Sequence, residues 1–316
     1  MIWRRYGRRL PEKRGRMSID IEDKSDSESK SKAAESCRTI IDGIEKIPTL
    51  PAVLSKLLTV LEDPKSNIKS VSRLIGSDPA MTARILKIVN SAYYGFPREI
   101  STVDQAIVIL GFNAVKSLAL SATVVQIFGV RGEGAFDLRA FWEHSIGTGV
   151  FADMLARRLQ YPLPEEVFCA AVLHGIGKVI LDQYLHALFI EAVAMARSKR
   201  MPLERAERAV CAIDHCQVGA MLAERWKLPL QIQESIRFYP APPKATVNPF
   251  VVSIVHVGHY IAREMVCGDP GDRAQPRVSE EAKKILKISS ADIDDCLTKA
   301  KSELSKAEDV LAALVD

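Results

Sequence analysis

Apolar residues recur with the period of an α-helix along the chain from residue 36 onwards. Leu54, Leu57, Leu58 and Leu61, for example, follow the spacing i, i+3, i+4, i+7, which places all four on one face of a helix. Strict alternation of apolar and polar residues, the pattern of a half-buried strand, is missing from the sequence. The sequence therefore predicts an all-α, multi-helical fold.

Residues that favour helix ends punctuate this pattern. Asp78 followed by Pro79 is typical of an N-cap with proline in the first turn. Thr102 and Gln105 have the spacing of a capping box, and Gly111 favours the end of the helix that they open. Further helices are predicted over residues 113–128, 141–159, 184–198, 202–210, 214–227, 229–238 and 248–265, with a short apolar helix ending near residue 174.

Changes in composition predict how the chain is organised. Residues 36–265 are expected to form one helical domain, because helical periodicity continues through them. A glycine-rich loop at 129–134 separates two lobes of this domain, and a linker at 268–278 follows it. The expected segments are a disordered tail at 1–35, an N-terminal lobe at 36–130, a second lobe at 135–265, and two C-terminal helices at 279–316 that pack on the body or mediate self-association.

The basic charge of the chain is concentrated in its first 16 residues. They carry seven basic side chains and one acidic one, whereas the formal net charge of the whole chain is +4, so the remainder is slightly acidic. The body therefore has no broad basic surface for nucleic acid. We expect residues 1–35 to be a solvated tail, with Met17 as a second candidate start. A nucleic-acid or membrane tether is the alternative.

Cysteine usage and hydropathy predict a cytoplasmic location. None of the six cysteines forms a CxxC pair, which favours reduced, buried thiols. The most apolar run, residues 118–130, is interrupted by polar side chains and falls short of the roughly 18 residues that span a bilayer. The basic N-terminal segment lacks the apolar stretch of a secretory signal.

Histidines are the residues with most potential for chemistry. His256 and His259 are i, i+3 neighbours on a predicted helix and could chelate one zinc ion together with His144 and His174. His186 is expected to be a bystander. No phosphate-binding loop, nucleophile elbow or dinucleotide motif is present, so kinase, esterase and dehydrogenase functions lack support.

Five motifs in order resemble the HDOD domain, a helical relative of the HD-superfamily phosphohydrolases. The stretch Ala-Val-Leu-His-Gly-Ile-Gly-Lys at residues 171–178 is similar to the HD signature, in which a His-Asp pair precedes Ile-Gly-Lys. The resemblance covers about residues 40–265. The other four motifs lie at residues 77–94, 100–111, 141–145 and 213–229.

The resemblance implies a phosphohydrolase centre that has lost its acidic ligands. His144 and His174 match the first two histidine positions, but Gly175 stands where the paired aspartate is expected. The final aspartate should lie within residues 253–260, which contain histidines and no acid. The resemblance thus implies a non-catalytic regulatory module without a cofactor, which binds a signalling protein or a small ligand. The alternative is a residual metal-dependent phosphohydrolase acting on nucleotides or cyclic dinucleotides through His144, His174, His256 and His259.

Other residues of this vestigial pocket have simpler interpretations. Asp214 precedes a predicted helix that begins at His215, and an N-cap is expected there. Lys178 is expected to be solvated, with phosphate contact as the alternative. Gly175 and Gly177 most simply supply a helix C-cap and a tight turn.

A second candidate surface follows the helix that begins after Asp78. Asn90, Ser91, Tyr93 and Tyr94 lie at its end and could line an interaction surface. Alternatively, Asn90 and Ser91 satisfy the free carbonyls of the helix end while the tyrosines pack against the body.

Overall fold

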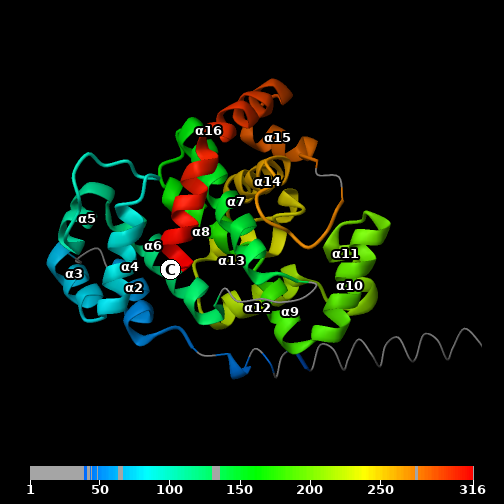
Figure 1. Cartoon of the computed structure of the whole chain (residues 1–316), viewed down its shortest axis with the longest axis horizontal. Helices are drawn as coiled ribbons and strands as arrows, with labels where there is room; N and C mark the ends of the chain where they lie inside the picture. Colours follow the sequence, from blue (N-terminus) through cyan, green and yellow to red (C-terminus); the bar gives the residue numbers. More distant parts are fainter. Residues whose placement is uncertain are drawn as a thin grey trace, which may run out of the picture.

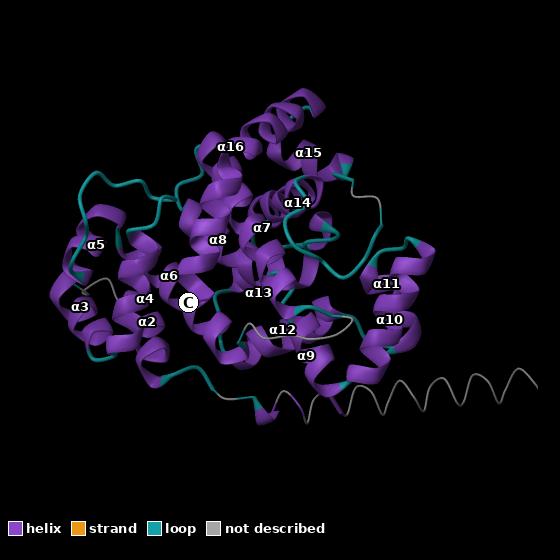
Figure 2. Cartoon of the chain, in the orientation of Figure 1, coloured by secondary structure: helices purple, strands orange, loops and turns teal. Residues whose placement is uncertain are grey.

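The computed structural model describes residues 39–40, 43, 45–47, 49–62, 67–129, 136–274 and 277–315. Within these ranges the regular structure is helical and no strand occurs, which confirms the predicted all-α fold (Figure 2). The predicted tail at 1–35 and most of the glycine-rich loop at 129–134 lie outside the described residues.

The first group of helices forms one side of the molecule (Figure 1). Two predicted caps are present: the Asp78 carboxylate accepts from the Met81 amide at 3.0 Å, and the Thr102 hydroxyl accepts from the Gln105 amide at 3.2 Å. The Gln105 side chain accepts from the Ser101 amide at 3.1 Å, so the capping box is shifted by one residue from its predicted form. The helices of this group are α2 (Ala52–Glu62), α3 (Ile68–Gly76), α4 (Pro79–Val89), α5 (Val103–Leu110) and α6 (Phe112–Phe128).

Three helices form the centre of the second half: α7 (Leu138–Arg158), α8 (Pro164–Leu173) and α14 (Pro249–Glu264). Glycine allows α14 to approach α7 closely, because a Cβ at Gly258 would lie 2.9 Å from the Thr148 carbonyl oxygen and 2.9 Å from the Ala152 Cβ. This approach brings the next residue, His259, toward α7.

A further set of helices surrounds this centre. Gly177 begins α9, where the sequence predicts only a C-cap and a turn. A Cβ on Gly177 would lie 1.9 Å from the His215 carbonyl oxygen, so this glycine is required for the contact between α9 and α12. The helices of the set are α9 (Gly177–Tyr184), α10 (His186–Lys199), α11 (Leu203–Val210), α12 (His215–Arg225), α13 (Leu230–Phe238) and the short 3-10 helix η1 (Pro242–Lys244).

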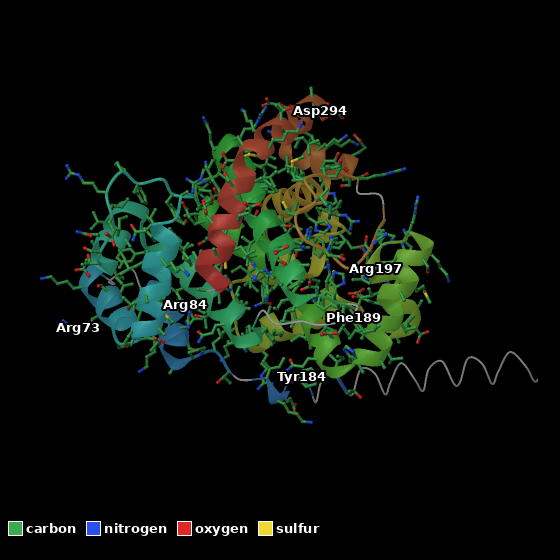
Figure 3. The ribbon with its side chains drawn as sticks, in the orientation of Figure 1. Arg73, Arg84, Tyr184, Phe189, Arg197 and Asp294 are labelled. Carbon is green, nitrogen blue, oxygen red and sulfur yellow. The ribbon has the colours of Figure 1, made fainter. Side chains whose placement is uncertain are left out.

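Two helices complete the chain, α15 (Glu280–Leu286) and α16 (Ser290–Val315). Helix α16 crosses α7 and also contacts α4 and α6, so it packs on both groups of helices (Figure 1). Lys87 of α4 donates to the Ala312 carbonyl oxygen at 3.1 Å. The segment before α15 is held by Arg197 of α10, which is labelled in Figure 3. Its guanidinium group donates to the Asp269 carboxylate at 2.7 Å.

One described segment corrects the expectation that no stretch has the length and hydropathy of a membrane span. Residues Pro164–Tyr184, which include α8 and α9, meet that criterion, but 83% of their most apolar window is buried inside the protein. The segment is thus part of the hydrophobic core. The described cysteines are free, and all except the partly exposed Cys267 are buried: Cys169, Cys211, Cys216 and Cys296.

Candidate functional site

Three histidines from distant parts of the chain meet at the centre of the second half. His144 lies on α7, His174 follows the end of α8, and His259 lies on α14. Nδ1 of His259 is 2.9 Å from Nε2 of His144 and 3.2 Å from Nε2 of His174. One nitrogen from each ring lies within 4.8 Å of the other two. We call this set the histidine cluster.

Backbone carbonyls orient two of the three rings. Nδ1 of His174 donates to the Ala171 carbonyl at 2.5 Å, and Nδ1 of His144 donates to the Cys267 carbonyl at 3.2 Å. Gly268 makes the second contact feasible, because it has a φ of +58° and a Cβ there would lie 2.5 Å from the His144 amide nitrogen. With both Nδ1 atoms used as donors, both Nε2 atoms point their lone pairs at His259.

Burial keeps the histidine cluster neutral. His144 and His174 are completely inaccessible to solvent. Burial, reinforced by Lys178, lowers the pKa of His174 to about 3. Burial and the neighbouring imidazoles likewise lower the pKa of His144 and of His259 well below the usual value. The cluster is therefore a set of uncharged imidazoles whose nitrogens can act as metal ligands.

The acidic side chains near the histidine cluster are already paired with other residues. Asp272 pairs with Arg263 at 2.8 Å and accepts from the amide of Leu203. Glu207 accepts from both the backbone amide and Nδ1 of His215, at 2.9 and 2.6 Å. Among the described residues, no carboxylate oxygen converges with the three histidine nitrogens.

A buried chain of hydrogen bonds runs alongside the histidine cluster. His215 contacts Glu207 through Nδ1 and the Tyr239 hydroxyl through Nε2, the latter at 2.7 Å. Burial lowers the pKa of His215, but Cys216 and Glu207 outweigh it and raise that pKa to about 10. The Tyr239 ring packs edge-on against His174, with centroids 4.6 Å apart. Sequence reasoning missed Glu207 and Tyr239, since neither lies in a matching motif.

A cavity of about 230 Å³ opens beside His259 and Tyr239. Lys178 lines it and is almost inaccessible, at 1% exposure, in contrast to the solvated lysine that the sequence predicts. Its ammonium group donates to the Pro270 carbonyl at 2.8 Å, and burial lowers its pKa. The remaining lining residues include Glu204, His215, His256, Tyr260, Arg263, Asp272 and Arg277.

Two residues predicted for this pocket have structural roles. His256 does not join the histidine cluster: its Nδ1 contacts the Tyr239 carbonyl at 2.9 Å, and its Nε2 accepts from the Ser279 amide at 3.1 Å. The predicted four-histidine chelate is therefore wrong, because His256 points from α14 toward the start of α15. Asp214 is the N-cap of α12 and accepts from the Gln217 amide at 2.9 Å.

The polar residues at the end of α4 bond to nearby backbone groups. The Asn90 amide group donates to the carbonyls of Leu86 and Ile100 and accepts from the Ile100 amide. The Ser91 hydroxyl donates to the Ile88 carbonyl at 2.6 Å, so both polar residues satisfy the local backbone.

The two tyrosines that follow lie between the helix groups. Tyr93 packs on Phe168 of α8 with ring centroids 5.9 Å apart. Tyr93 and Tyr94 also line a cavity of about 530 Å³ together with Asp153 and Arg157 of α7. The predicted interaction surface is thus reduced to the part of these tyrosines that faces the cavity.

His186 lies apart from the histidine cluster, as the sequence predicts. Its imidazole, on the first residue of α10, is 68% exposed and contacts Asp182 of α9 at 2.9 Å.

Searches against known proteins match residues 47–242 to the model of the HDOD domain family. An uncharacterized protein of Treponema pallidum is 26% identical over 208 residues, covering 66% of this chain and 40% of that protein. The uncharacterized protein YuxH of Bacillus subtilis is 28% identical over 138 residues, covering 44% of this chain and 32% of YuxH. The chain thus matches less than half the length of either relative.

Solved structures share the fold. An HDOD domain protein of unknown function from Geobacter sulfurreducens has a TM-score of 0.74 at 23% identity, covering 90% of this chain and 97% of its own. A protein from Shewanella amazonensis, named as a candidate phosphohydrolase, has a TM-score of 0.68 at 25% identity. The match covers 87% of this chain and 98% of that protein's chain. With the family match spanning more than half of the sequence, this chain belongs to the HDOD domain family.

Proposed function

We propose that this chain is a cytoplasmic, non-catalytic signalling module that acts by binding a protein partner or a small ligand. One observation supports this above the others: the site at the HD position offers three neutral imidazoles and no carboxylate. Hydrolytic centres with two metal ions require acidic ligands that bridge and balance the cations. The binuclear centre of the HD phosphohydrolases therefore does not fit the residues present.

The carboxylate that the family pattern places beside His174 has no substitute nearby. Gly175 has no side chain, and its hypothetical Cβ would lie 3.0 Å from the Phe141 ring, so an aromatic side chain borders this position. Asp272 is already paired with Arg263, and releasing it would break a buried ion pair. These contacts oppose recruitment of an acid from elsewhere in the pocket.

The size of the cavity beside His259 restricts the ligand. Its volume of about 230 Å³ is below the roughly 300–1,000 Å³ that ligand pockets usually enclose. Lys178, Arg263 and Arg277 give its lining an excess of basic side chains over Glu204 and Asp272. A phosphate-sized anion suits this cavity better than a nucleotide or a cyclic dinucleotide.

Turnover measurements test the proposal directly. The full chain is incubated with nucleotides or cyclic dinucleotides and with Mg²⁺, Mn²⁺ or Zn²⁺, and released phosphate is measured. We expect no release above the chelator-treated sample. A metal-dependent rate that is lost in His174→Ala and kept in His186→Ala would overturn the proposal and favour the phosphohydrolase.

Ligand binding is tested separately. Thermal unfolding is followed with increasing inorganic phosphate for the full chain and for Lys178→Met, which removes the charge and keeps most of the length of the buried side chain. A phosphate-dependent rise in Tm that disappears in the variant supports a small anionic ligand. An equal rise in both proteins would contradict phosphate binding at Lys178.

A further inference from the structure

The three rings of the histidine cluster leave a hydrogen-bonding shortage. Nδ1 of His144 and Nδ1 of His174 are committed to backbone carbonyls, so both neutral rings present an Nε2 lone pair. A proton on Nδ1 of His259 can be donated well to only one of them. The two buried Nε2 lone pairs therefore compete for a single proton, and a buried acceptor with an incomplete hydrogen bond is unfavourable.

We propose that the histidine cluster binds a single zinc-type transition-metal ion through Nε2 of His144, Nε2 of His174 and Nδ1 of His259. Such an ion would accept all three lone pairs at once. This inference goes beyond the proposed signalling function and does not depend on whether the chain hydrolyses phosphate esters.

The spacing of the three nitrogens suits one ion. Zinc binds imidazole nitrogen at about 2.0–2.1 Å, which in a tetrahedron places ligand nitrogens roughly 3.3 Å apart. The two nitrogen pairs that include His259 are 2.9 and 3.2 Å apart, and all three atoms lie within 4.8 Å. Small movements of the rings would therefore complete the geometry.

The surroundings of the rings match those of metal-binding histidines. Such histidines usually donate their second ring nitrogen to a carbonyl or carboxylate, which fixes the tautomer. His144 and His174 each have this contact with a backbone carbonyl. Three histidines with water in the fourth position also form a known type of zinc site, and no fourth protein ligand converges here among the described residues.

The donor set selects the class of metal. Neutral imidazoles favour zinc, nickel, cobalt or copper, whereas magnesium, calcium and manganese prefer carboxylate and carbonyl oxygen. Without a carboxylate, the histidine cluster should discriminate strongly against Mg²⁺ and Ca²⁺.

Metal binding to the untagged full chain tests the inference. After loading with Zn²⁺ and gel filtration, elemental analysis should find about one equivalent per chain, with Mg²⁺ in excess having no effect. His259→Ala and the closer-sized His259→Gln should each retain less than about a tenth of that amount. His186→Ala, which removes an exposed histidine, and His256→Gln, which alters a neighbour on the same helix, should retain it.

A second measurement covers the case in which a His259 variant is poorly folded. Co²⁺ bound by the wild-type chain should show the intense visible absorption of a four-coordinate site, and Zn²⁺ should displace it. Failure of the wild-type chain to hold zinc, a six-coordinate cobalt spectrum, or equal zinc in wild type and both His259 variants would overturn the inference. Phosphate release, in contrast, would challenge only the proposed function.

Discussion

Nε2 of His144 lies 2.9 Å from Nδ1 of His259, although 115 residues separate the two histidines in the sequence. Two glycines make this contact feasible. Gly258 lets α14 lie against α7, and Gly268 lets the chain beyond α14 return to the first turns of α7. The histidine cluster therefore depends on backbone approach as much as on the histidines themselves.

Gly258→Ala should disrupt the histidine cluster without altering a ligand. The new methyl group would lie 2.9 Å from the Thr148 carbonyl oxygen, so α14 must shift away from α7. We expect a loss of about 1–3 kcal/mol in the free energy of unfolding and at least about a tenfold loss in zinc affinity, equivalent to about 1.4 kcal/mol. Urea unfolding and zinc titration measure the two effects.

Gly76→Ala is the matched control for this prediction. No atom lies within 4 Å of the Cβ it would add, and Gly76 is the last residue of α3. Alanine there should be neutral or stabilising by up to about 1 kcal/mol. If both variants behave alike, the close approach of α14 and α7 is not what positions His259.

The stability of the protein should fall at alkaline pH because of His215. Its pKa is raised to about 10 in the folded protein, against about 6.5 in the unfolded chain. Because the folded protein favours protonated His215, this residue contributes its full stabilisation below about pH 6.5, and the contribution is lost as the pH rises toward 10. Between pH 7 and 9 the free energy of unfolding should decrease by up to about 1.4 kcal/mol per pH unit from this residue.

His215→Gln tests whether that slope belongs to His215. The variant should be less stable than wild type at pH 7, and its stability should change less between pH 7 and 9 when measured by urea unfolding. His186→Gln removes an exposed histidine and should keep the wild-type slope. Parallel pH profiles for wild type and His215→Gln would contradict the assignment.

Helices could be predicted well from the sequence because their signals are local. The Asp78 cap depends only on residues within one turn, and it is present in the structure. Helix α9 was missed for a tertiary reason. Gly177 favours a turn by local preference, yet its contact with the His215 carbonyl makes it the first residue of a helix. A contact between residues 38 positions apart leaves no signal in helical periodicity.

The histidine cluster could be predicted only in part. Motif position identified His144 and His174, and helical spacing placed His256 and His259 near each other. Spacing alone could not show that one turn of α14 directs His259 to the cluster and His256 to the Ser279 amide. That choice depends on how α14 is rotated against α7, which packing of the whole domain decides.

Asp214 should contribute to stability through its helix cap. Its carboxylate accepts from the Gln217 amide, and it also pairs with Arg208. Asp214→Ala should destabilise the protein by about 1–2 kcal/mol, whereas Asp214→Asn, which keeps a good capping group, should lose less than about 1 kcal/mol. Urea unfolding measures both, and zinc content should stay at the wild-type level. Loss of zinc in Asp214→Asn would show that the residue serves the site instead.

Gly175→Asp should change which metals the site prefers. An aspartate Cβ would lie 3.0 Å from the Phe141 ring, so a small rotation of that ring should accommodate it. The new carboxylate beside His174 adds the negative charge and oxygen ligand that hard cations need. We expect Mn²⁺ affinity to rise by at least about tenfold, or about 1.4 kcal/mol, while Zn²⁺ still binds.

Titration calorimetry with both ions on wild type, Gly175→Asp and Gly175→Asn separates the effect of charge from that of size, because asparagine matches the shape of aspartate without its charge. Equal Mn²⁺ binding by all three proteins would mean that the missing acid is not what excludes hard cations, and the case for a non-catalytic site would lose its main support.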